Sequence, residues 1–258
     1  MEAGQRALES ALWGDVQAAA ELGRLRAPLD ELAQAGDGAA RSLLGGVALE
    51  YDKDLNHALR HFSLAAEQGH PAGLRGLGYL YQRGLGVDRD LEAAERLFRL
   101  AADAGDSYAK FNLAMTHFVG EQTGDRMSPA QVMSLLVEAA EGGIQQASAV
   151  LGDWFADLDR EAEAFQWYLT AANAGNAAAM FAVAQRLRDG LGIERDDVEA
   201  VCWFLKMLQV GDGDGIHEAI EMARTMSDAD LRRAGRKAGD VSGAETLIHT
   251  VRRPGSAD

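Results

Sequence analysis

The sequence predicts an all-α protein, a right-handed α-solenoid of about five to six stacked antiparallel helix-turn-helix repeats. The first observation behind this prediction is a recurring glycine, at positions 36, 69, 105, 143, 175 and 211, each after a stretch with helical apolar spacing. Glycine suits that place because a helix often ends on a residue in the left-handed conformation. A two-helix unit of this length cannot bury its apolar side alone, so neighbouring units must stack.

The second observation is a repeated pattern between the glycines. After each of the first five glycines, a first helix (helix A) has a small residue at the fourth position and a leucine or valine with a small residue at the eighth and ninth. These offsets share one side of a helix, and the small residues let its partner approach closely. The second helix (helix B) carries large side chains followed by two alanines, as in Leu97-Phe98 and Ala101-Ala102.

Two copies carry the fullest pattern. Copy 70–105 contains Leu77-Gly78, Tyr81, Gly84-Leu85-Gly86-Val87, Asp90, Ala94 and Ala101-Ala102, and copy 176–211 contains Gly190-Leu191-Gly192-Ile193, Asp196 and Ala200. This pattern resembles the Sel-one-like repeat (SLR), a relative of the tetratricopeptide repeat. The resemblance implies an adaptor that assembles protein complexes. It also implies an alternative, because some secreted members with a disulfide in each hairpin are credited with binding small molecules of the cell-wall type. A chain with one cysteine cannot form those disulfides.

In chain order, we expect a degenerate N-terminal capping hairpin over 1–36, with Pro28 in the first turn of its second helix. Five repeats follow, at 37–69, 70–105, 106–143, 144–175 and 176–211. The longest connection, 120–128, ends in Ser128-Pro129-Ala130-Gln131, a strong helix-start signal. Capping helices are expected over 212–240, including one at 228–238 capped by Ser227, and then a partly disordered tail over 241–258.

The side of helix A that faces away from helix B is predicted to line a concave groove. Phe111, Met115 and Phe118 place three large apolar side chains on that side of one helix, and such a surface marks a binding site. We therefore predict that a peptide or helix of a partner protein binds there. The predicted groove residues are Arg75, Tyr79, Phe111, Met115, Phe118, Asp153, Phe181, Gln185 and Arg188. The alternative is that superhelical twist turns the same side chains into the seam between adjacent A helices.

The formal net charge of −15 favours basic partners and disfavours nucleic acids and anionic membranes, although it is also the charge of an ordinary soluble surface. No apolar run approaches the length of a membrane span, and the first residues lack the pattern of a secretory signal. We therefore expect a cytoplasmic protein that is a monomer or a weak homo-oligomer.

The sequence offers little support for chemistry. It shows no nucleophile, base and orienting group in a recognisable set, so we expect a non-enzymatic protein without a metal or cofactor; the alternative is a hydrolase-like or small-molecule-binding repeat protein. The stretch 212–215 lacks the ligand spacing of a calcium loop, and the turns at 84–87 and 190–193 follow no strand. Cys202 occupies a position that is polar in the other repeats, and we expect the C-terminal helices to bury it.

Overall fold

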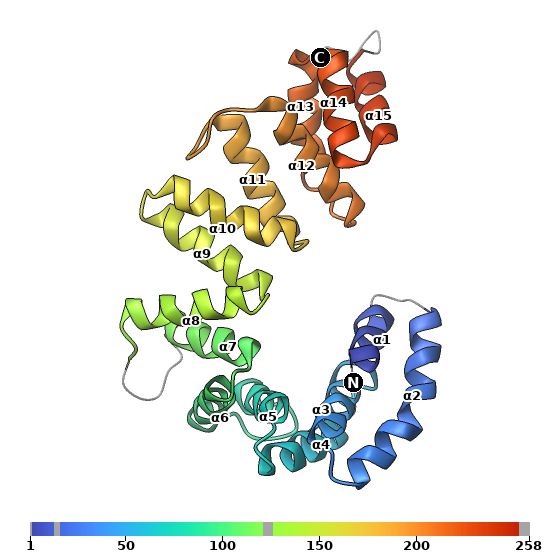
Figure 1. The fold of residues 1–258 in the computed structure, drawn as a ribbon, viewed down its shortest axis with the longest axis vertical. Coiled ribbons are helices and arrows are strands. Elements are labelled where there is room, and N and C mark those ends of the chain that lie inside the picture. The colour runs from blue at the N-terminus through green and yellow to red at the C-terminus, as the bar shows by residue number, and fades with distance from the viewer. Residues whose placement is uncertain (1, 13–15, 121–125, 253–258) are drawn as a thin grey trace. The chain divides into compact units, whose positions relative to one another are not determined.

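The structure is a computed structural model that describes residues 2–12, 16–120 and 126–252. Within these ranges every regular element is a helix, which confirms the predicted all-α class (Figure 1). The chain forms two compact units, Met1–Ala139 and Ala140–Asp258. None of the described helices has the length and apolar content needed to cross a bilayer.

The first unit is built from helices that pair in chain order. It contains α1 (Glu2–Leu12), α2 (Val16–Gln34), α3 (Gly38–Gly46) with its π-helical continuation η1 (Val47–Tyr51), α4 (Leu55–Glu67), α5 (Pro71–Arg83), α6 (Leu91–Asp103), α7 (Ser107–Phe118) and most of α8 (Pro129–Glu141). In repeat terms, α3, α5 and α7 are A helices, and α4, α6 and α8 are B helices.

The second unit continues the same alternation. It contains α9 (Gln145–Asp157), α10 (Glu161–Asn173), α11 (Ala177–Asp189) and α12 (Asp197–Gln209), followed by α13 (Ile216–Thr225), α14 (Asp228–Ala238) and α15 (Val241–Arg252). Here α9 and α11 are A helices, and α10 and α12 are B helices. The Asp230 N–H donates to Ser227 Oγ at 3.1 Å, so the predicted helix at 228–238 and its cap are confirmed.

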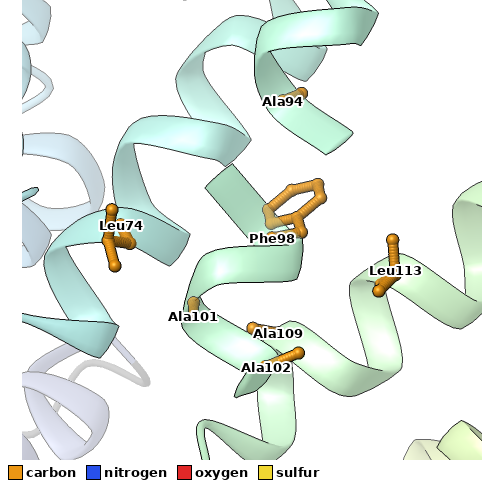
Figure 2. Close-up of a cluster of buried hydrophobic side chains, with 7 residues drawn as sticks. All are labelled: Leu74, Ala94, Phe98, Ala101, Ala102, Ala109 and Leu113. Atoms are coloured by element: carbon orange, nitrogen blue, oxygen red, sulfur yellow. The ribbon is translucent and has the colours of Figure 1, made fainter. Parts of the chain in front are cut away.

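Glycines on the A helices make room for aromatic rings of the B helices. A Cβ added to Gly78 would lie 2.9 Å from the ring of Phe98, and one added to Gly152 would lie 2.6 Å from the ring of Tyr168. This confirms the close approach that the small residues predict. Phe98 is fully buried, and Figure 2 shows the cluster around it, which contains Leu74, Ala94, Ala101, Ala102, Ala109 and Leu113.

The helix ends also agree with the sequence pattern. The six glycines that close the repeats have φ between +70° and +96°, the left-handed conformation expected of them. At the start of α8, the Ser128 N–H donates to Gln131 Oε1 at 2.9 Å and the Gln131 N–H donates to Ser128 Oγ at 3.3 Å. This reciprocal pair is the capping box predicted there.

The predicted place of Pro28 is wrong. α2 runs without a break from Val16 to Gln34, and Pro28 lies inside it. Proline has no N–H to donate to the carbonyl four residues earlier, so this position costs the helix a hydrogen bond. Buried side chains on both sides of the proline, Leu22 and Leu29 among them, hold the helix together across it.

The structure contradicts the predicted tail over 241–252, which is all of the tail that the structure describes. Residues 241–252 form α15, which buries Ala244, Leu247 and Ile248. The three residues share one side of a helix, which is enough apolar surface once a neighbouring helix covers it. Arg252 fastens the end of α15, because its Nη2 donates to the carbonyl oxygen of Met226 at 2.6 Å. Residues 253–258 lie outside the described part of the chain.

Candidate functional site

Arg75 connects two A helices of the first unit. Its Nε donates to Asp106 Oδ2 at 3.1 Å, and its guanidinium carbon lies 5.1 Å from the ring centre of Tyr108. Asp106 also caps α7, since its Oδ1 accepts the N–H of Ala109 at 2.8 Å. Arg75 therefore holds the start of α7 against α5. Tyr79, one turn further along α5, is half-buried.

One side of α7 carries five apolar side chains, which we call the α7 strip. Phe111 and Met115 are half-buried, and the exposed fractions are 46% for Tyr108, 47% for Phe118 and 58% for Val119. The spacing of three and four residues along α7 places these side chains on one face. Phe111, Met115 and Phe118 thus share one face of α7, and Tyr108 and the C-cap residue Val119 continue the same spacing at its two ends.

In the second unit, three of the four predicted residues contact other residues of the same unit. Asp153 accepts a hydrogen bond from the Tyr168 hydroxyl at 2.5 Å, and Phe181 meets the buried ring of Phe204 edge-on with 5.7 Å between ring centres. Arg188 donates to both carboxylate oxygens of Asp189, at 2.7 and 2.9 Å, and also to Glu218. Gln185 is half-buried.

These contacts shift the titration of two side chains. Burial, helped by the hydrogen bond to Asp153, raises the pKa of Tyr168 well above its ordinary value. The hydrogen bond from Arg188 lowers the pKa of Asp189. Both shifts favour the protonation states that make the contacts, a neutral phenol for Tyr168 and an ionised carboxylate for Asp189. The polar groups of Asp153 and Arg188 are therefore engaged within the unit.

A cavity of about 360 Å³ lies beside Arg75 in the first unit. We call it the α3–α5 cavity, because those two helices form most of its wall together with α1 and α4. The ring of Phe62 reaches it between Gly45 and Gly76, where an added Cβ would lie 2.7 and 2.4 Å from the ring. The sequence analysis did not find this cavity. The feature of the sequence that could have indicated the cavity is a set of small residues on the A helices. These residues include Ala39, Ser42, Gly46 and Ala72.

Ser42 and His70 form a pair at this cavity, with Oγ and Nδ1 2.9 Å apart. The Ser42 hydroxyl also donates to the carbonyl oxygen of Gly38 at 2.7 Å. A hydroxyl has one proton, and this one is directed to Gly38, so Ser42 accepts from His70. A histidine that donates to a serine does not activate it as a nucleophile. The pair therefore ties α3 to the start of α5.

A buried pair joins the consecutive helices α6 and α7. His117 Nε2 lies 3.4 Å from Glu95 Oε1, and both side chains are buried. His117 Nδ1 accepts the N–H of Met127 at 3.2 Å, and Glu95 accepts from Arg99 Nη2 at 2.8 Å. The group fastens α6, α7 and the residue before the α8 cap. Of the connection at 120–128, residues 121–125 lie outside the described part of the chain.

The described residues contain no group of three or more His, Cys, Asp or Glu side chains placed to hold a metal ion. The two glycine turns make packing contacts: Gly86 lies against Leu55, and Gly192 against the peptide between Glu161 and Ala162. Cys202 is buried, as predicted, and burial raises the pKa of its thiol. α14 packs on the helix that carries it.

A family model described as the Sel1 repeat matches the chain at residues 32–70, 71–106, 155–176 and 177–212. These segments make up about half of the chain. Among curated proteins, the chain is similar to rat DAP3-binding cell death enhancer 1, with 27% identity over 62% of this chain and 32% of that protein. It is also similar to human protein sel-1 homolog 2, with 34% identity over 26% of this chain and 11% of that protein. The chain thus spans at most about a third of the length of these relatives.

Two solved structures share the fold. The Escherichia coli protein c5321, described as a protective antigen with an SLR fold, aligns with a TM-score of 0.70 and 23% identity over 99% of this chain and 60% of its own. A Sel1 repeat protein from Oxalobacter formigenes aligns with a TM-score of 0.63 and 20% identity over 84% of this chain and 99% of its own.

Proposed function

Because the chain belongs to the Sel1 repeat family, we propose that it is a non-catalytic adaptor that binds a peptide or helix of another protein on the A-helix face of its first unit. Proteins built from Sel1 repeats generally mediate protein–protein interactions, and one rat relative is named for binding DAP3. The proposal goes further than this family property, because it names the face and the kind of ligand.

The α7 strip is the observation that carries the proposal. Exposed apolar side chains scattered singly are ordinary on a protein surface, but a contiguous group of large ones is typical of a binding surface. Aromatic side chains and methionine are also the residues that such interfaces favour. Tyr79 on α5 and Arg75, which contacts Tyr108, extend this surface toward the preceding A helix.

In the second unit, Asp153, Phe181, Gln185 and Arg188 are proposed as secondary contacts only. Asp153 and Arg188 already form polar contacts within the unit, and Phe181 packs on the buried Phe204. A partner would have to break these contacts, or bind to the side chains without disturbing them. The first unit provides the stronger candidate surface because the α7 strip places large, exposed apolar side chains on one face.

The proposal can be tested by capture of the partner with a double variant, Phe111→Ser and Phe118→Ser. We expect the variant to remain helical by circular dichroism and to lose at least about tenfold in affinity for a partner that the unaltered protein retains, because buried aromatic anchors carry much of an interface's binding energy. The measurement is quantitative capture from a lysate of the source cell, followed by titration of each retained protein in purified form.

The matched control is the double variant Leu191→Ser and Ile193→Ser, which removes two exposed apolar side chains from a turn of the second unit. It should leave the affinity unchanged. If the α7 variant keeps full affinity for every retained partner, or if both double variants lose affinity equally, the face has been assigned wrongly.

A further inference from the structure

We propose that the α3–α5 cavity accepts one long basic side chain, an arginine, from the partner segment that binds the first unit. This inference rests on the proposed function and deepens it by naming the chemistry of the partner. It is carried by the position, wall and charge of the cavity.

The cavity is continuous with the proposed binding face. Arg75 lines the cavity and contacts Asp106 and Tyr108 at the start of α7, so one side chain borders both sites. Arg75 lies on α5 and contacts both the cavity and Tyr108 of the α7 strip, so a partner segment that crosses this side chain reaches both sites. A short partner segment can therefore contact the α7 strip and fill the cavity.

Part of the cavity wall is apolar and suits the methylene stem of a long side chain. Leu8 comes from α1, Leu43 and Gly46 from α3, and the ring of Phe62 from α4. The volume of about 360 Å³ lies at the lower end of the range for ligand sites, which is enough for a side chain but small for a folded element. Arginine and lysine bury such stems while their charged ends stay near water.

The charge of the cavity differs between its two ends. At one end, the positive charge of Arg75 is already offset by the carboxylate of Asp106. Glu50 lies eight residues beyond Ser42 along α3 and η1, roughly 12 Å further on. Its carboxylate lies 3.9 Å from Lys53 Nζ, on a side chain that is 72% exposed. Glu50 therefore provides a negative charge to which an incoming cation can bind.

The local backbone supports this assignment. Glu50 belongs to η1, the π-helical end of α3, and π-helical turns occur frequently at functional sites. The wider turn changes the direction of the side chains that follow it. An arginine in the cavity would direct its guanidinium toward Glu50 and away from Arg75. The net charge of −15 on the whole chain also favours the binding of a positively charged side chain.

The test uses two capped amino acids as probes, N-acetyl-arginine methylamide and the neutral isostere N-acetyl-citrulline methylamide. Each is titrated into the full chain while the amide signals of Ser42, Gly46 and Ala72 are followed by NMR. We expect saturable shifts with the arginine probe and roughly two- to fivefold weaker binding of the citrulline probe, the size of effect that one exposed ion pair supplies. Glu50→Gln should bring the two affinities together.

Ala72→Leu, which fills the cavity, should abolish the shifts. Its matched control is Ala178→Leu, at the corresponding position of α11, where the alanine is exposed. This control should leave the shifts unchanged. Equal binding of the two probes to the unaltered protein would overturn the choice of a basic occupant, and absence of saturable shifts would overturn the site. If either result occurred while the Phe111 and Phe118 variant still lost its partner, the adaptor proposal would stand and this inference alone would fall. If the arginine probe bound and the double variant kept its partner, the adaptor face would be wrong instead.

Discussion

At the scale of single residues, His61 is a polar residue at a repeat position that is apolar in the other copies. The other copies place Leu97, Leu135, Trp167 and Trp203 there. His61 is half-buried on α4, and its Nδ1 is buried without a hydrogen-bond partner in the described part of the chain. Burial lowers the pKa of His61 below its ordinary value, and the nearby carboxylate of Asp30 opposes this effect without reversing it.

This environment predicts a pH dependence of stability. Because the pKa of His61 is lower in the folded state, the unfolded chain binds more protons as the pH falls below about 6.5, and the free energy of unfolding decreases there. His61→Leu should raise that free energy by about 1 kcal/mol at pH 8, by removing an unsatisfied polar atom, and by more at pH 5.5. The measurement is urea unfolding at both pH values.

The exposed His217→Gln serves as the control and should leave the pH dependence unaltered. A gain from His61→Leu of the same size at both pH values would show that His61 does not titrate differently in the folded and unfolded chains.

At the scale of elements, the glycine turn of the fullest repeats connects each repeat to the one before it. In the second unit, Gly192 has φ +72°, and an added Cβ would lie 2.2 Å from the carbonyl oxygen of Glu161, at the start of α10. The turn therefore requires glycine for two reasons, the left-handed backbone and the close approach of another backbone. Gly211 has φ +83° but no atom within 4 Å of such a Cβ.

The two glycines allow these reasons to be separated. Gly211→Ala should lower the free energy of unfolding by about 1–2 kcal/mol, the cost of a left-handed alanine. Gly192→Ala should cost about 3 kcal/mol or more, because the backbone of α10 must also move. Urea unfolding of both variants gives the comparison. Equal losses would mean that the turn and α10 are further apart than the structure places them.

At the scale of the whole molecule, the helices after the last repeat matter because a repeat leaves an apolar face that a neighbour must cover. In the second unit, α14 packs on α12 and α15 packs on α14 and α13. Leu231 and Ala234 of α14 are completely buried, and α15 contributes Ala244, Leu247 and Ile248. α15 is thus a part of the folded unit, where the composition of the segment predicted a tail.

A substitution within α15 distinguishes a folded helix from a tail. Leu247→Ala should lower the free energy of unfolding by about 2–5 kcal/mol, as is usual for a buried leucine. Val241→Ala, in the same helix at a side chain that is 57% exposed, should change it by less than about 0.5 kcal/mol. Thermal and urea unfolding provide the values. Equal, negligible effects of the two substitutions would support the tail.

The sequence by itself determined the repeat, because its signals are local. The closing glycines, the small residues of the A helices and the caps at Ser128 and Ser227 each depend on residues within a few positions or within one hairpin. The paired helices and three residues of the α7 strip follow from the same periodicity. The prediction that Pro28 lies in the first turn of a helix was wrong, because buried leucines on both sides of the proline hold one continuous helix together and override its helix-breaking propensity.

Only the tertiary structure decided which side chains remain available for binding. Arg75 with Asp106, His117 with Glu95, and Ser42 with His70 join residues 22 to 31 positions apart, and their spacing follows no motif. The α3–α5 cavity likewise depends on four helices meeting around small residues. Such contacts are set by how neighbouring repeats pack, and a periodic pattern specifies the side of a helix but not the neighbour that covers it.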